Sequence, residues 1–289
     1  MATASEDLEG EISKLKTNSE LSKRILSGVI IIPTCVLIAY INGWIFSLFI
    51  GVILTISIWE YFSLFKGKSY ELNGVLLLSS PVVFCLAQHL YLYPFPIVFA
   101  LFMLLVALAI FYSVWQYEQG QENALLNFGF TVAGITFIAL LGSFLVALRN
   151  LPQGFYWTFL TIPAISAADI GAYFVGSRFG KHKLAPRTSP HKTWEGYWGG
   201  VVCAVVYSVV FSYFVQPHVP NLSIVEGGLL GLVLGAISPI SDLFESMLKR
   251  YLQVKDTSQL IPGHGGMLDR VDTWLIGGVA SYYLVLLIQ

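Results

Sequence analysis

The chain has 289 residues, of which 56% are hydrophobic and 11% are charged, and its formal net charge at pH 7 is −1. A mean hydropathy of +0.71 excludes an ordinary soluble globular protein, and the near-zero net charge gives no electrostatic reason to expect a nucleic acid as partner. Apolar segments of about 20 residues, the length that a helix needs to cross a bilayer, recur along the chain. We therefore predict an all-α polytopic membrane protein.

The chain begins with a polar, acidic segment, residues 1–24, which we interpret as a cytoplasmic tail. Nine apolar segments follow, and each is predicted to cross the membrane as a helix. They are residues 25–41, 43–65, 72–91, 94–115, 127–148, 155–179, 197–215, 224–248 and 271–288.

The two halves of the chain differ in polarity. The spans before residue 150 hold almost no ionisable groups, and the exceptions, Glu60 and His89, are expected to be interface residues with ordinary partners. Acids, Gly, Pro and Ser interrupt the later spans. We predict a transmembrane scaffold at residues 25–150 and a transmembrane catalytic domain at residues 151–289.

The basic residues predict the orientation. If the N-terminus is cytoplasmic, all but one of the 16 Lys and Arg residues fall on the inner side, and Arg149 is the exception. This asymmetry follows the positive-inside rule, so the C-terminus is expected outside. The composition leaves a bacterial inner membrane and an organelle membrane equally open.

Two polar features stand out in the first part of the predicted catalytic domain. Asp169 lies in the middle of an apolar span, where a carboxylate costs at least about 2.5–3.5 kcal/mol unless it faces a cavity or a cation. A structural hydrogen bond is the alternative. The following basic loop, residues 181–196, is expected on the inner side in any case, but its Lys, Ser and Thr groups are also suited to phosphate oxygens.

A second polar group lies at the end of the eighth predicted span. Asp242, Glu245 and Lys249 are spaced so that they share one helix face. They form either a ligand site or a self-contained salt-bridge cluster.

A glycine-rich turn precedes the last predicted span. Three glycines surround His264, and such a backbone can direct N–H groups at an anion. Asp269 and Asp272 follow beside Arg270, although a carboxylate at a helix start can also act as a simple cap.

These residue types predict a metal-dependent transfer of a phosphoryl or nucleotidyl group. Carboxylate oxygens suit Mg²⁺ rather than a soft metal, and the surrounding cations suit a polyphosphate. Such chemistry depends mainly on positioning and on stabilisation of charge.

The same residues resemble the signature of the phosphatidate cytidylyltransferase (CDP-diacylglycerol synthase) family. The motif residues are Ser246, Lys249, Arg250, Lys255, Asp256, His264, Gly265, Gly266, Asp269, Arg270 and Asp272. The segments around Asp169, Ser189–Gly196 and Asp242–Ser246 are similar to further motifs of that family. The resemblance covers residues 165–289.

The resemblance implies conversion of CTP and phosphatidate to CDP-diacylglycerol and pyrophosphate at the cytoplasmic face of a bilayer, with Mg²⁺ and room for a second cation, monovalent or divalent. The expected metal ligands are Asp242 and Asp269, supported by Asp272 and Asp169. The expected catalytic cations are Lys249, Arg250, Lys255, His264 and Arg270. The expected substrate contacts are Ser189, Lys192, Thr193 and Glu245.

Other functions remain open at this stage. A CTP-dependent lipid-alcohol kinase uses similar groups, and an ion-coupled transporter also places acids in interrupted helices. A non-catalytic scaffold is the third alternative. The chain is also compatible with a homodimer, for which the candidate contacts are Gly227, Gly228, Gly231 and Gly235.

Overall fold

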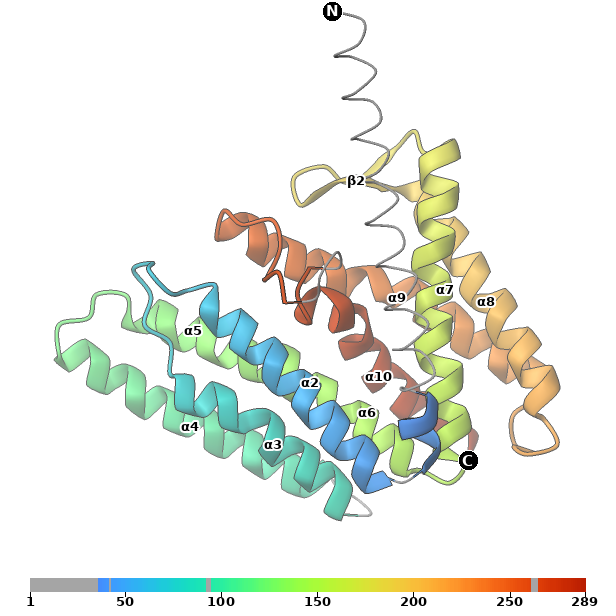
Figure 1. The fold of residues 1–289 in the computed structure, drawn as a ribbon, viewed down its shortest axis with the longest axis horizontal. Helices are drawn as coiled ribbons and strands as arrows, with labels where there is room; N and C mark the ends of the chain where they lie inside the picture. The colour runs from blue at the N-terminus through green and yellow to red at the C-terminus, as the bar shows by residue number, and fades with distance from the viewer. Residues whose placement is uncertain (1–35, 42, 92–94, 261–264) are drawn as a thin grey trace, which may run out of the picture.

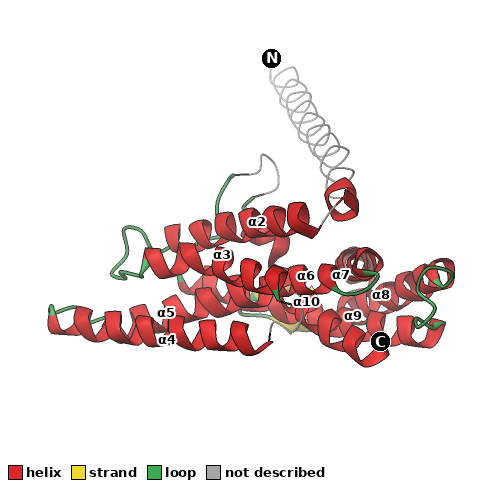
Figure 2. Cartoon of the chain, turned by 90° about the horizontal axis from the view of Figure 1, so that it is seen from below, coloured by secondary structure: helices red, strands yellow, loops and turns green. Residues whose placement is uncertain are grey.

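The computed structural model describes residues 36–41, 43–91, 95–260 and 265–289. The predicted cytoplasmic tail, most of the first predicted span and His264 lie outside the described residues. Within them the chain is almost entirely helical (Figure 2). The helices are α2 (Gly43–Ser63), α3 (Gly74–Leu90), α4 (Phe95–Glu118), α5 (Ala124–Gly134), α6 (Leu141–Asn150), α7 (Gly154–Phe179), α8 (Trp194–Val215), α9 (Ile224–Tyr251) and α10 (Leu268–Ile288).

A helical segment lies at each predicted span after the first, and the predicted ends differ from the helix ends by no more than three residues. Seven described helices are long and apolar enough to cross a bilayer, and α3, with 17 residues, is shorter. One of the seven joins α5 to α6 through a π-helical turn, η1 (Ile135–Leu140). The chain is therefore a multi-pass membrane protein.

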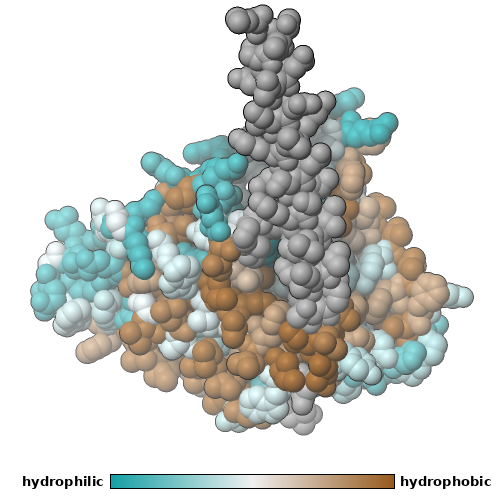
Figure 3. Space-filling view, viewed as in Figure 1, coloured by the Kyte–Doolittle hydropathy of each residue, from teal (hydrophilic) through white to brown (hydrophobic). Residues whose placement is uncertain are grey.

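The helices form two groups joined by α10 and α6 (Figure 1). On one side α2 packs against α3, and α4 against α5. On the other side α7 packs along α8, α8 along α9, and α9 along α10. Hydrophilic residues gather at the upper and left margins of the face in Figure 3, and hydrophobic residues cover its lower part.

Helices α7, α8 and α9 pack closely because small residues line their contacts. Gly227, Gly228, Gly231 and Gly235 of α9 all face α8 of the same chain, where an added Cβ would meet Ser212, Val209, Ala204 or Val201. For Gly227, Gly231 and Gly235, which are buried, the interpretation as contacts of a homodimer is therefore wrong, because α8 already occupies the surface that they offer.

Replacing Gly200 by Val is expected to lower the thermal unfolding temperature of the detergent-purified protein. A Cβ at Gly200 of α8 would lie 2.6 Å from the carbonyl oxygen of Ala168 on α7. Overpacking of this kind costs about 1–3 kcal/mol. Gly129→Val is the control, because a Cβ at Gly129 meets nothing within 4 Å. Equal unfolding temperatures for the two variants would contradict the packing argument.

The basic loop between α7 and α8 is a two-stranded antiparallel hairpin, β1 (Lys183–Ala185) and β2 (Ser189–Thr193). Glu195, at the start of α8, closes it by accepting hydrogen bonds from the backbone N–H groups of Lys181 and His182 and by pairing with Nδ1 of His182 at 2.6 Å. The hairpin thus has a fixed position at one end of the bundle.

Candidate active site

Three carboxylates from two helices meet at the contact between α9 and α10. Asp242 and Glu245 lie one turn apart on α9, and Asp272 lies in the second turn of α10. Their ligand oxygens are all within 4.8 Å of one another. Glu245 is 1% exposed and Asp272 is 6% exposed, so these two acids are buried, whereas the Asp242 side chain is 30% exposed.

The position of Asp272 is supported from α9. The Ser241 hydroxyl, next to Asp242 in the chain, donates a hydrogen bond to the backbone carbonyl of Asp272. Because this bond joins the two helices at the level of the cluster, it fixes the register in which their acids face each other.

Two further acids lie close to this cluster. Asp169 of α7 accepts a hydrogen bond from the Thr273 hydroxyl and lines the same cavity as Asp242. Asp269, in the first turn of α10, accepts hydrogen bonds from the backbone N–H groups of Thr257 at 3.1 Å and Gly266 at 2.9 Å.

Lysines face these acids from two directions. Lys249 Nζ lies 2.6 Å from Oδ1 of Asp269 and 3.2 Å from Oε1 of Glu245. Lys192, on β2, pairs with Asp242. The five acids named here carry up to five negative charges against the two positive charges of these lysines, so the local balance favours a further cation.

The structure distributes the predicted metal ligands differently from the sequence analysis. Asp242 and Asp272 lie in the cluster, but Asp269 does not belong to the group of three that it describes there. Glu245, predicted as a substrate contact, takes that place. Asp269 instead accepts hydrogen bonds from the backbone N–H groups of Thr257 and Gly266 and pairs with Lys249, and its expected role as a metal ligand stays a prediction.

A cavity of about 550 Å³ opens beside the cluster, between α7, the hairpin, α8 and α9. Small side chains and glycines form much of its wall and leave room for a ligand. Its polar lining residues are Asp169, Tyr173, Ser177, Lys183, His191, Lys192, Thr193, Tyr197, Ser238 and Asp242. Such a mixture of space, acids and lysines suits a phosphorylated substrate accompanied by a cation.

The other predicted basic residues lie at the same end of the bundle. Arg250, Lys255 and Arg270 are exposed, and Nε of Arg250 reaches the Thr188 carbonyl of the hairpin at 3.4 Å. This contact brings the end of α9 against the hairpin that carries Lys192.

Thr193 and Ser189, two predicted substrate contacts, both have a place in the structure of the hairpin. The Thr193 hydroxyl accepts a hydrogen bond from the backbone N–H of Gly196 at 3.2 Å and caps α8. Ser189 stands opposite Ala185 in the hairpin register. Of the β2 residues predicted to bind substrate, Lys192 is the one paired with the carboxylate cluster.

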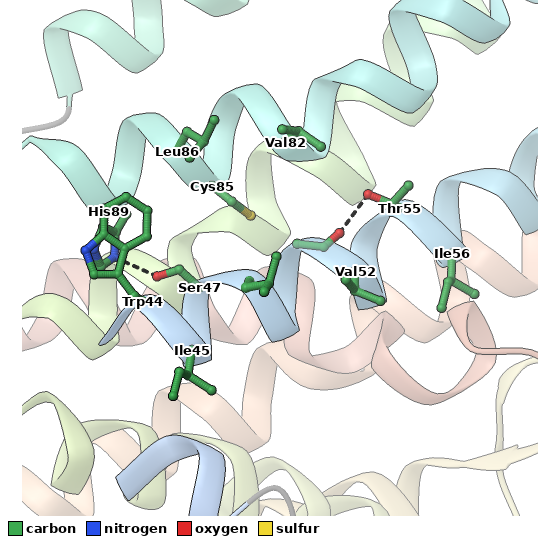
Figure 4. A pocket seen from close by; sticks show the side chains of 12 residues that line it. Trp44, Ile45, Ser47, Val52, Thr55, Ile56, Val82, Cys85, Leu86 and His89 are labelled. Carbon is green, nitrogen blue, oxygen red and sulfur yellow. Dashed lines mark hydrogen bonds between the residues drawn. The ribbon is translucent and has the colours of Figure 1, made fainter. Parts of the chain in front are cut away.

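Another cavity, of about 460 Å³, lies between α2 and α3 (Figure 4). At one end the Ser47 hydroxyl is 2.8 Å from Nδ1 of His89, whose ring packs against Trp44. The other described residues of its lining are predominantly apolar, and they include no Asp, Glu, Lys or Arg. Since the charged groups that the predicted chemistry needs lie elsewhere, this cavity is not the candidate active site.

The sequence analysis singled out Glu60 only as an interface residue with ordinary partners. This acid of α2 is fully buried, and its oxygens lie within hydrogen-bonding distance of donors from residues 257, 258, 267 and 268, which border the candidate site. The signal for such a role was a carboxylate inside a predicted scaffold that holds almost no other ionisable groups.

Comparison with known proteins places these residues in context. A family model described as "Cytidylyltransferase family" matches residues 22–288. A phosphatidate cytidylyltransferase of Bacillus subtilis (strain 168) is 30% identical over 277 residues, which cover 93% of this chain and 98% of the relative. A protein of the same name from Synechocystis is 32% identical over 303 residues, covering 92% and 97% respectively. A third, from Haemophilus influenzae, is 52% identical over 108 residues, covering 37% and 38%.

Proposed function

The chain belongs to the cytidylyltransferase family, and we propose from this premise that it is a phosphatidate cytidylyltransferase. It converts CTP and phosphatidate to CDP-diacylglycerol and pyrophosphate in phospholipid biosynthesis. The observation that carries the proposal is the carboxylate cluster of Asp242, Glu245 and Asp272, which lies beside two lysines and an open cavity. Two relatives with this printed name, from Bacillus subtilis and Synechocystis, match over nearly the whole chain.

The cluster suits a divalent cation, and we assign it to Mg²⁺. All three side chains offer hard oxygen ligands. Oε1 of Glu245 is buried and has no hydrogen-bond partner among the described residues, although Lys249 lies within ion-pair distance. Asp242, Glu245 and Asp272 would hold the ion, with Asp169 in support. When bound, the ion neutralises negative charge on phosphate oxygens.

The residues of the chain have to bring two anions together. A phosphate oxygen of phosphatidate attacks the α-phosphorus of CTP, the bond between the α-phosphorus and the bridging oxygen breaks, and pyrophosphate leaves. The attacking oxygen is already anionic, so no strong general base is needed. Lys192 and Lys249 offset the negative charge at the cluster. Holding the two substrates in line and stabilising their charge lowers the activation barrier of the transfer.

The remaining basic groups would hold the phosphates of CTP and the leaving pyrophosphate. They are Arg250, Lys255, His264 and Arg270. Ser189 and Thr193 would contact substrate from the hairpin. The bilayer delivers phosphatidate laterally between the helices, and the site faces the cytoplasm, in either a bacterial inner membrane or an organelle membrane.

The proposal predicts which part of CTP reaches the lipid. Protein purified in detergent should transfer label from [α-³²P]CTP to the lipid and release pyrophosphate, but only when phosphatidate and Mg²⁺ are both present. Transfer of label from [γ-³²P]CTP to a lipid would instead identify a kinase. Absence of CTP consumption, together with ion flux in proteoliposomes, would identify a transporter.

A further inference from the structure

Among the residues that the structure describes, Glu60 is the most completely buried acid that the proposed reaction does not use. It lies near the end of α2, in the predicted scaffold, and its exposed fraction is 0%. A buried carboxylate is stable only when its oxygens are paired. Each oxygen of Glu60 lies within hydrogen-bonding distance of two donor groups, and all four groups belong to residues about 200 positions later in the chain.

Two of the donors are backbone N–H groups at the start of α10. Met267 N lies 2.9 Å from Oε1 and Leu268 N lies 2.8 Å from Oε2. The first N–H groups of a helix have no partner within the helix, and an acceptor with negative charge suits them best. The residue before α10 is Met267, which has no capping side chain. Glu60 supplies the cap from another helix.

The other two donors are hydroxyl groups in the segment after α9. Ser258 Oγ donates to Oε1 at 2.6 Å, and Thr257 Oγ1 lies 3.2 Å from Oε2. The same Thr257 hydroxyl lies 2.9 Å from Oδ2 of Asp269. One carboxylate therefore holds residues 257–258 and the first turn of α10 together.

The first turn of α10 determines where Asp272 lies. Asp272 follows Leu268 by one helical turn, and its carbonyl is held by Ser241 of α9. Glu60 therefore holds the start of the segment 267–272, and Ser241 holds its end. A shift of the start of α10 would therefore move Asp272 relative to Asp242 and Glu245.

We propose that Glu60 is a positioning residue, which caps α10 from the scaffold and so holds Asp272 in metal-binding geometry with Asp242 and Glu245. The inference rests on the proposed function, since it concerns the metal site of that reaction. It also gives the scaffold a role in the reaction, because a group of α2 sets the geometry of a site formed by α9 and α10.

The bonding pattern predicts that glutamine cannot replace Glu60. Each oxygen accepts from one hydroxyl and one backbone N–H. A hydroxyl can rotate and accept, but a backbone N–H cannot. Whichever way the amide of Glu60→Gln is turned, its NH₂ group faces Met267 N or Leu268 N, and that helix-starting N–H loses its acceptor.

The test is direct binding of Mn²⁺, used in place of Mg²⁺ and measured by EPR on detergent-purified protein without substrate. Glu60→Gln is expected to weaken Mn²⁺ binding at least about tenfold, as loss of support for a ligand does. The matched control is Gln116→Ala, which removes a buried side chain whose partners, Glu71 and Asn127, belong to the scaffold. This control should bind Mn²⁺ as the unmodified protein does, even if its unfolding temperature falls.

The possible results separate the two proposals. If the unmodified protein binds no Mn²⁺, the metal site itself is wrong. If it binds Mn²⁺ and Glu60→Gln binds equally well, the positioning role is wrong. If Glu60→Gln does not fold, Ser258→Ala removes one donor and should weaken binding about threefold, the effect of one hydrogen bond; unchanged binding there overturns the inference. Glu60→Asp, which keeps the charge, should bind more tightly than Glu60→Gln.

Discussion

Replacing Asp272 by Asn is expected to reduce kcat about a thousandfold or more, which corresponds to roughly 4 kcal/mol of transition-state stabilisation. The substitution keeps the size of the side chain but removes a charged oxygen ligand from a cluster whose members lie within 4.8 Å of one another. Because Asp272 is nearly buried and faces two other acids, its loss relieves repulsion between like charges. The unfolding temperature without Mg²⁺ should stay the same or rise.

Pyrophosphate release and thermal unfolding, measured on the same preparation, check this prediction. Glu118→Gln is the control, since it removes an exposed acid at the end of α4 and should leave both quantities unchanged. Turnover of Asp272→Asn near that of the unmodified protein, with the same dependence on Mg²⁺, would contradict the assignment of Asp272 as a ligand.

The helices were predictable because a bilayer imposes a minimum length and excludes unpaired backbone groups. The apolar segments locate the ends of α7 to α10 to within three residues, but α9 continues over Lys249 and Arg250, and α10 begins before Asp269. The hairpin between α7 and α8 was not predicted, because a basic loop satisfies the positive-inside rule without any strands. Its closure by Glu195 and His182 depends on a contact between side chains at the two ends of the hairpin.

The candidate site was predictable in composition but not in arrangement. Spacing shows that Asp242 and Glu245 share a helix face, and the structure places both with Asp272. Spacing does not show that Glu245 lies with Asp242 and Asp272, or that Asp269 pairs with Lys249 and the backbone of the preceding loop; the predicted roles of Asp269 and Glu245 stay predictions. The partners of Glu60 were not predicted because they lie about 200 positions away, and hydrogen bonds at that separation leave no local pattern.

The glycines of α9 show the same limit of prediction from sequence. A row of small residues on α9 predicts a close helix contact, but its partner can be another copy or another helix of the same chain. The structure assigns the partner as α8. The sequence thus predicts that α9 makes a close helix contact, whereas only the folded structure shows which helix makes it.

Replacing Lys249 by Met is expected to impair both folding stability and turnover. Nζ of Lys249 pairs with Asp269 at 2.6 Å and with Glu245 at 3.2 Å, and its side chain is 13% exposed. Methionine keeps the unbranched shape but leaves two largely buried acids without this partner. Breaking one side of a buried pair costs about 3–5 kcal/mol, so the unfolding temperature measured in chelator should fall markedly.

A second substitution separates the two effects of Lys249. The double variant Lys249→Met/Glu245→Gln also removes the negative charge of Glu245, one of the two charges that Lys249→Met leaves unpaired. Much of the stability lost in Lys249→Met should therefore return. Pyrophosphate release should stay low, because the double variant lacks both a cation and a metal ligand. Lys66→Met, at an exposed lysine after α2, should change neither quantity. If the double variant is no more stable than Lys249→Met, the charge of Glu245 is not what Lys249 offsets; if it regains turnover, neither group belongs to the reaction.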